Sequence, residues 1–170
     1  MGGSPKSTVP VGTGSEVERI IREVAPEADV SVASNPEFLR ESAAIADFKV
    51  PDRVVIGVEN DRAAEVLNAV YRPICPEVAP LLVMRRRSAE LTKYAANSFL
   101  ATKISFINEV ADLCEQIGAD IDEVAHAMGT DRRIGPQFLN AGPGYDGSCF
   151  LASWWTFATS TIPERWRPPA

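Results

Sequence analysis

The longest uninterrupted segment of this chain, residues 85–118, contains no proline and has its only glycine at the last position. Apolar residues recur through it at spacings of mostly three to five, which predicts a helix that ends at Gly118 in a left-handed conformation. These residues are Leu91, Tyr94, Ala95, Phe99, Ile104, Ile107, Ala111, Cys114 and Ile117. At about 1.5 Å per residue the helix would span roughly 50 Å, longer than a domain of this size is wide. We therefore expect it to connect two parts of the protein.

Two polar residues, Lys93 and Asn97, lie within an apolar part of this predicted helix. Because they are four residues apart, they project from the same face. One interpretation is that the lysine extends to water and the asparagine lies on a solvated stripe. The other is that the two side chains form a pair of hydrogen-bond donors that faces a polar ligand. Their spacing alone leaves both interpretations open.

The composition argues against nucleic acid and membranes as partners of this chain. The net charge of the 170 residues is −6, and the one basic cluster, residues 85–87, begins the long helix, so we do not expect nucleic acid as a partner. No apolar run is long enough to cross a bilayer and the first residues lack a signal-peptide core, which predicts a cytoplasmic protein without a membrane partner. Cys75, Cys114 and Cys149 are widely spaced, so they predict neither a metal site nor a disulfide scaffold.

The remainder of the chain alternates between strand and helix patterns. Predicted strands are an extended piece at 6–13 and the segments 29–34, 53–58 and 79–84. A helix is predicted at 61–71, and others follow Ser15, Pro36 and Asp120. Ser15 and Glu18 read as a capping box, and Glu37 and Glu41 are expected to share a face of the helix after Pro36. This alternation predicts an α/β fold with parallel strands joined by crossovers.

Two glycine-rich segments are candidates for ligand contact. The turn GTGSEV at residues 12–17 partly fits a dinucleotide-binding pattern, but its strand is short and contains Pro10, so we do not assign it to a cofactor. The segment FLNAGPGYDGSCF at residues 138–150 has three glycines and a proline around Cys149. Such a loop brings backbone amides close to a ligand. The lone histidine, His126, has no second histidine beside it and predicts a structural or solvent-facing role.

Four groups of motifs, KSTVPVGT, NPEFLRE with PDRVVIG, ELTKYAANSFLATKISFINE and GPGYDGSCF, occur in an order and spacing that resembles the UDP-glucose/GDP-mannose dehydrogenase family. The resemblance covers residues 6–150, and PDRVVIG and the Cys149-Phe150 pair favour its UDP-glucose branch. It implies a partial Rossmann-like parallel sheet at 1–84, the rear half of an NAD-binding domain, and a helical central domain at 85–150 built on the long helix. Residues 151–170 change in composition and predict a disordered tail.

The resemblance also implies an activity and a set of site residues. Family members use NAD to oxidise the C6 alcohol of a nucleotide sugar twice, through an aldehyde, a cysteine thiohemiacetal and a thioester. By motif position Cys149 would be the nucleophile, Lys93 and Asn97 would stabilise the oxyanion, Thr8 with Glu37 would hold the catalytic water, and Thr8 and Glu41 would lie by the cofactor. Substrate contacts would come from Glu37, Phe38, Leu39, Arg40, Lys93, Asn97, Phe138, Leu139, Asn140, Ala141, Gly142 and Gly144. The implied partners are UDP-glucose and a second copy of the chain, bound through the long helix.

Some positions depart from the family pattern. Leu151, Ala152 and Ser153 stand where the cysteine motif continues with proline, lysine and aspartate, and Asp146 replaces a glycine. The nucleotide-binding turn at the start of family members does not occur here. We therefore expect a chain truncated at both ends with little or no turnover. The alternatives are a dehydrogenase of GDP-mannose or a related nucleotide sugar, and an inactive fragment that self-associates through the long helix.

Overall fold

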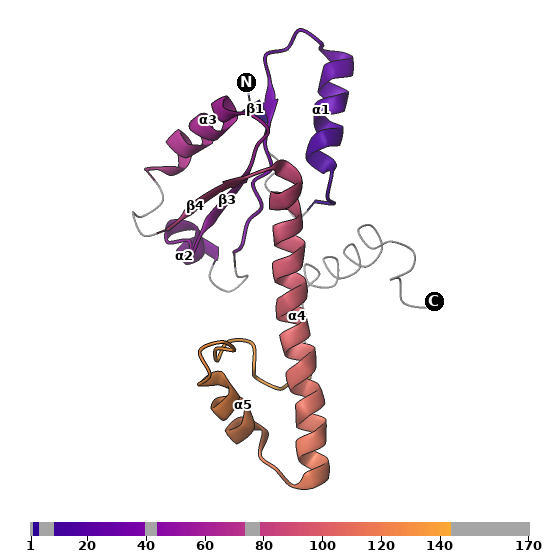
Figure 1. Ribbon diagram of the computed structural model, residues 1–170, viewed down its shortest axis with the longest axis vertical. Coiled ribbons are helices and arrows are strands. Elements are labelled where there is room, and N and C mark those ends of the chain that lie inside the picture. The colour runs from indigo at the N-terminus through magenta and orange to yellow at the C-terminus, as the bar shows by residue number, and fades with distance from the viewer. Residues whose placement is uncertain (1, 4–8, 40–43, 74–78, 144–170) are drawn as a thin grey trace, which may run out of the picture. The chain divides into compact units, whose positions relative to one another are not determined.

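The structure is a computed structural model that describes residues 2–3, 9–39, 44–73 and 79–143. The elements in chain order are β1 (Gly2–Gly3), α1 (Thr13–Val24), β2 (Ser31–Val32), α2 (Ala44–Lys49), β3 (Val54–Gly57), α3 (Asp61–Tyr71), β4 (Leu81–Met84), α4 (Arg86–Ile117) and α5 (Ile121–Gly129) (Figure 1). The described residues fall into two compact units, which meet in sequence between Tyr94 and Ala95. The domain limits expected from the sequence resemblance stay a prediction.

The first unit contains two pairs of parallel strands, which confirms the predicted parallel pairing. The first strand is β1 at Gly2–Gly3, however, and the strand expected at 6–13 is wrong for its described residues 9–13, because Thr13 begins α1. Gly2 pairs with Ser31 in the β1 and β2 pair, and Val54 pairs with Leu81 in the β3 and β4 pair. The two pairs are linked where Ser34 and Gly57 exchange backbone hydrogen bonds of 2.8 Å and 2.7 Å. The strand segment after β2 therefore lies against the end of β3.

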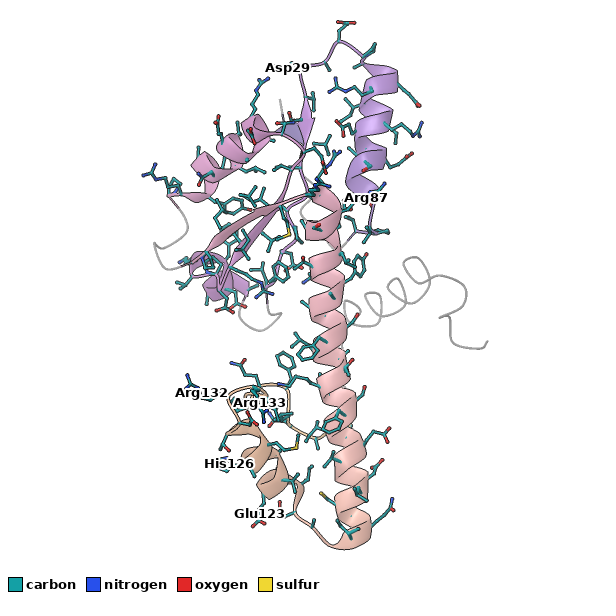
Figure 2. The ribbon with its side chains drawn as sticks, in the orientation of Figure 1. Asp29, Arg87, Glu123, His126, Arg132 and Arg133 are labelled. Atoms are coloured by element: carbon teal, nitrogen blue, oxygen red, sulfur yellow. The ribbon has the colours of Figure 1, made fainter. Side chains whose placement is uncertain are left out.

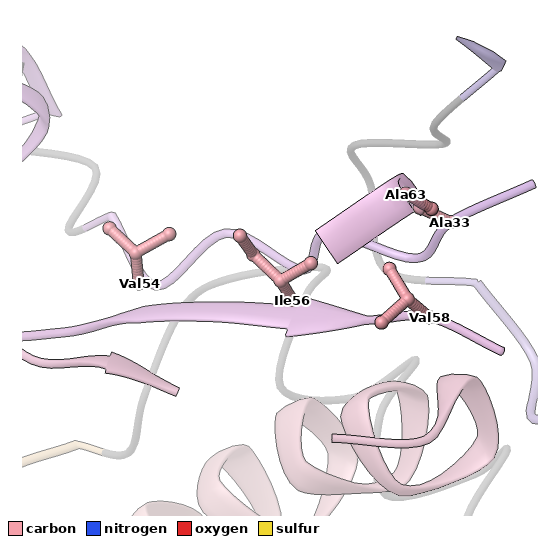
Figure 3. Packing of buried hydrophobic residues seen from close by; sticks show 5 residues of the cluster. All are labelled: Ala33, Val54, Ile56, Val58 and Ala63. Carbon is pink, nitrogen blue, oxygen red and sulfur yellow. The ribbon is translucent and has the colours of Figure 1, made fainter. Parts of the chain in front are cut away.

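The core of this unit is built on one face of β3. Val54, Ile56 and Val58 alternate along the chain and pack with Ala33 and Ala63 (Figure 3). Val55, which points to the other face, is also fully buried. A strand buried on both faces is the expected result of a continuous apolar run in a parallel sheet, so the prediction for residues 53–58 is confirmed.

Helix α1 begins differently from the prediction. Its N-cap is Gly12, at a left-handed φ of 102°, and no side chain caps it. The expected capping box of Ser15 and Glu18 is therefore wrong. Because the Gly12 turn starts the helix at Thr13, Glu18 lies in the second turn, and its carboxylate pairs with Arg86 instead.

The segment after Pro36 also corrects the sequence prediction. Residues 35–39 have no helical structure, and α2 begins at Ala44. The Glu37 carboxylate accepts a hydrogen bond of 2.7 Å from the Leu39 amide, a local bond that competes with helix formation. Glu37 thus does not share a helical face with Glu41, which lies outside the described residues.

The long helix is confirmed as α4, with 32 residues. Gly118 follows at a φ of 74°, and the Ala119 amide bonds back to the Cys114 carbonyl at 3.0 Å, as expected of a glycine-ended helix. Within the second unit, Ala101, Ile107, Cys114 and Leu139 are buried. Asp120 caps α5 by accepting from the amides of Asp122 and Glu123.

The apolar residues of α4 differ in exposure. Tyr94, Ile107 and Cys114 are buried, whereas Leu91, Phe99 and Ile117 are exposed. Phe106 and Leu113, which are absent from the apolar set predicted for this helix, are exposed as well.

None of the described helices combines the length and the apolar composition that a membrane span requires.

Candidate active site

Lys93 is buried in the first unit against a carboxylate. The residue is 6% exposed, and its Nζ lies 3.4 Å from Oε1 of Glu37. Glu37 keeps 26% of its side chain exposed, so this ion pair lies at the edge of the protein interior. The structure therefore contradicts the interpretation in which Lys93 extends into water, and it brings together two of the predicted catalytic residues.

The Phe38 ring forms a third part of this group. Lys93 Nζ lies 5.3 Å from the ring centroid, and the Arg53 guanidinium carbon lies 4.2 Å from it. Both distances are within the range of a cation–π contact. Arg53 immediately precedes β3, so the strand that forms the core also fixes a cation beside the predicted substrate segment.

The segment that carries Glu37 and Phe38 is anchored by its neighbour Asn35. Asn35 is 4% exposed, its Nδ2 donates to the Val55 carbonyl at 2.8 Å, and its Oδ1 accepts a short hydrogen bond from the Tyr71 hydroxyl. Buried amide groups need such partners, and here they come from β3 and α3. The local path of residues 35–38 is thus determined by the core of the unit.

A second polar group lies at the N-terminus of α1. Glu90, on α4 and 3% exposed, accepts hydrogen bonds from Gly12 N (2.6 Å), Gly14 N (2.9 Å) and Ser34 Oγ (2.9 Å). A helix N-terminus attracts an anion, and this one is occupied by a carboxylate of the chain itself. The amides of Gly12 and Gly14 are thus already bonded within the chain.

Arg86, one turn before Glu90 on α4, lies in the same region and is 5% exposed. It pairs with Glu18, and its Nη1 donates to the carbonyls of Gly14 at 3.2 Å and Val32 at 3.4 Å. Its buried Nε makes no hydrogen bond among the described residues and lies 3.5 Å from Oε1 of Glu59. Arg87, the next residue, is exposed at the start of α4 (Figure 2).

Leu39, a predicted substrate contact, is half-buried in the first unit, and the second unit contains the remaining predicted residues that the structure describes. Asn97 is 8% exposed. In the predicted substrate loop, Phe138 has a φ of 63°, unusual for a residue with a side chain, while Leu139 is buried at 3% exposure. Asn140 is exposed, Ala141 is half-buried, and the Gly142 amide donates to Asn108 Oδ1 on α4 at 2.9 Å.

The turn before this loop is held by an ion pair. The Arg133 guanidinium bonds the Asp131 carboxyl at 2.6 Å and holds its pKa below the usual value. His126 is exposed on α5 (Figure 2), in keeping with its predicted solvent-facing role.

Several of the predicted site residues lie outside the described residues: Thr8, Arg40, Glu41, Gly144 and Cys149. Cys75 also lies outside them.

Sequence reasoning missed three charged residues of this region: Arg53, Arg86 and Glu90. One signal was present, because Glu90 lies three residues before Lys93 and therefore on nearly the same side of the helix. Arg53 carried no such signal, since a cation before a buried strand usually only extends to solvent. Its contact with Phe38 arises from the tertiary fold.

Two family models match the chain. Residues 4–75 match the NAD binding domain of the UDP-glucose/GDP-mannose dehydrogenase family, and residues 87–162 match the central domain of the same family. A UDP-glucose 6-dehydrogenase from Rhizobium meliloti is 65% identical over 147 residues, a match that covers 85% of this chain and 34% of that protein. The chain thus spans about a third of the length of the curated relatives it matches.

Solved structures similar to this chain point to the same family. The chain is similar to a UDP-glucose dehydrogenase from Pyrobaculum islandicum, with a TM-score of 0.86 and 50% identity over 92% of this chain and 36% of that one. A GDP-mannose dehydrogenase from Pseudomonas aeruginosa gives a TM-score of 0.72 and 28% identity over 96% of this chain and 39% of that one. Sequence, fold and the two matched domains lead to one conclusion: the chain belongs to the UDP-glucose/GDP-mannose dehydrogenase family.

Proposed function

We propose that this chain forms part of the active site of an NAD-dependent dehydrogenase that oxidises UDP-glucose to UDP-glucuronate in the cytoplasm. The observation that carries the proposal is the ion pair between the buried Lys93 and Glu37 beside Phe38, because three residues expected to contact the sugar nucleotide lie together. A cation held at low exposure is suited to stabilising negative charge on an oxygen.

In this proposal the family motifs give each residue a role at the sugar's C6 atom. The thiolate of Cys149 adds to the C6 aldehyde and forms a thiohemiacetal, whose oxygen is stabilised by the Lys93 ammonium and the Asn97 amide. Oxidation gives a thioester, and a water held by Thr8 and Glu37 attacks its carbonyl carbon, so that the thiolate leaves and the carboxylate forms. NAD, when bound, supplies the acceptor for the hydride in both oxidations.

The N-terminus of α1 is not open to the pyrophosphate of the cofactor. A pyrophosphate needs free amides at a helix N-terminus, and those of Gly12 and Gly14 bind Glu90. This helix N-terminus therefore does not fit a pyrophosphate. The expected positions of Thr8 and Glu41 by the cofactor remain part of the proposal, and binding of the sugar nucleotide is the property to measure on this chain.

UDP-glucose is the preferred substrate over GDP-mannose. The P. islandicum structure, 50% identical, is described as a UDP-glucose dehydrogenase, whereas the GDP-mannose dehydrogenase is 28% identical. Calorimetry with each nucleotide sugar separates the two, since UDP-glucose is expected to release heat at millimolar concentration and GDP-mannose to release much less.

The first prediction concerns Lys93. Lys93→Gln removes the ammonium and is expected to weaken UDP-glucose binding about tenfold, because charge-assisted hydrogen bonds are worth more than neutral ones. The matched control is Lys49→Gln, which removes an exposed lysine of α2. Calorimetry measures both dissociation constants. Equal constants for the two variants, or no heat from the unmodified chain, would contradict the proposal.

We further propose that the chain forms a homodimer through α4. The exposed apolar residues form a stripe on one side of this helix: Leu91 (37% exposed), Phe99 (65%), Phe106 (51%), Leu113 (52%) and Ile117 (68%). Phe99, Phe106 and Leu113 are seven residues apart, the spacing of helices that pair along their length. A second copy presents the same stripe, which makes the interface self-complementary.

The second prediction tests this dimer. Phe106→Glu is expected to convert the dimer to a monomer at micromolar concentration, because two carboxylates would be buried near the two-fold axis. Val66→Glu, on α3 and 56% exposed, is the matched control and is expected to leave the sedimentation coefficient unchanged. An unmodified chain that sediments as a monomer at all concentrations would rule out the interface.

A further inference from the structure

Glu90 connects three segments that each adjoin a predicted catalytic residue. It binds the turn at Gly12 and Gly14, which follows Thr8 in the sequence, and it binds Ser34, which precedes Glu37 by three residues. Glu90 itself precedes Lys93 by three residues on α4. One carboxylate thus binds segments that lie 56 to 78 positions before it in the chain.

Gly14 lies in close contact with this carboxylate and with Ser34. A Cβ atom at Gly14 would lie 3.0 Å from Ser34 Oγ and 3.1 Å from Glu90 Oε1, closer than most real contacts of a Cβ atom. Gly14 is buried, and its lack of a side chain allows the helix N-terminus to approach the carboxylate.

Both carboxylate oxygens of Glu90 accept hydrogen bonds from these segments. Gly12 N donates to Oε2, while Gly14 N and Ser34 Oγ donate to Oε1. In a glutamine one of these oxygens becomes an NH2 group, which cannot accept from a backbone amide. Glutamine would therefore lose at least one of the three hydrogen bonds and weaken the others by removing the negative charge.

We propose that Glu90 is a positioning residue of the active site: through its bonds to Gly12, Gly14 and Ser34 it sets the paths of the segments that lead from Thr8 and to Glu37, relative to the helix that carries Lys93. This inference rests on the proposed function for the roles of Thr8, Glu37 and Lys93. The role of Glu90 in shaping the segments is independent of it, because it follows from contacts present without ligand.

The experiment compares Glu90→Gln with the unmodified chain by hydrogen exchange of single amides in NMR spectra. The amides of Gly12 and Gly14 are expected to exchange about tenfold faster or more in the variant, the loss expected for a buried charge-assisted bond. The Leu39 amide, which binds Glu37 Oε2 at 2.7 Å without touching Glu90, is expected to exchange several-fold faster as well. Ala64 in α3 and Val124 in α5 serve as internal references and should not change.

UDP-glucose affinity is the second readout, measured by calorimetry on the same samples. Glu90→Gln is expected to raise the dissociation constant several-fold, whereas Glu65→Gln, an exposed glutamate of α3, is the control and should not. Faster exchange at Gly12 and Gly14 with an unchanged Leu39 amide would reduce Glu90 to a merely structural role and overturn the inference.

The experiment also distinguishes a failure of the proposed function from a failure of the variant to fold. If the unmodified chain binds no UDP-glucose, the proposed function fails, while the Leu39 amide still decides whether Glu90 sets the path of the Glu37 segment. If Glu90→Gln does not fold, Ser34→Ala removes one of the three bonds and is expected to give the same pattern at smaller amplitude. An unchanged Leu39 amide in Ser34→Ala would then overturn the inference.

Discussion

Replacing Gly57 by alanine is expected to lower the free energy of unfolding by about 3 kcal/mol, the upper end of the usual cost of an overpacked core. A Cβ atom at Gly57 would lie 2.7 Å from Ala89 Cβ and 2.8 Å from Arg86 Cα. These atoms belong to the first turn of α4 or are fixed to it, so no side-chain rotation relieves the contact. The strand or the helix must move, and Gly57 is also bonded to Ser34 on both its amide and its carbonyl.

Urea unfolding followed by circular dichroism measures this loss. The matched control is Gly142→Ala, where a Cβ atom would meet nothing within 4 Å, and its effect is expected to stay within about 0.5 kcal/mol. If Gly57→Ala unfolds at the same urea concentration as the unmodified chain, then β3 and α4 do not approach as closely as described.

Replacing Arg86 by methionine is expected to lower the free energy of unfolding by about 2 kcal/mol. Methionine has a similar length but cannot donate to the carbonyls of Gly14 and Val32, and it leaves the Glu18 carboxylate without its partner. Removing one member of a largely buried ion pair usually costs more than removing both. Glu18 is 35% exposed, so water reduces the cost from that side.

A double-mutant cycle measures the interaction energy between Arg86 and Glu18. Glu18→Gln alone is expected to cost less than Arg86→Met, and the double variant should be less destabilised than the sum of the two by about 1 kcal/mol. Additive effects would show that Arg86 stabilises the fold through contacts other than its pairing with Glu18. Thermal unfolding of the four proteins at one concentration provides the comparison.

The sequence predicted those elements whose signals are local. The helix at 61–71 agrees with α3 at both ends, and Gly118 ends α4 as expected, because caps and glycine conformations depend on neighbouring residues. The continuous apolar run at 53–58 likewise identified the buried β3. The capping box at Ser15 failed for the same kind of reason: Gly12 supplied a competing start three residues earlier.

The candidate site was predictable only through the family motifs. Helix periodicity placed Lys93 and Asn97 on one face but could not decide whether a ligand or water faced them. The pairing of Lys93 with Glu37 joins residues 56 positions apart, and no local rule specifies such a contact. Arg53 and Glu90 were missed because their roles depend on which segments the parallel strands bring together.

The buried carboxylate at α1 has a consequence for how the protein responds to its medium. The partial positive charge of that helix end is already neutralised by a group of the chain itself, with two amides and a hydroxyl bound to it. Sulfate or phosphate in a buffer finds no vacant place there. The Glu90 carboxylate acts as the counter-ion of this helix end, so we expect the local structure there not to require an anion from the buffer.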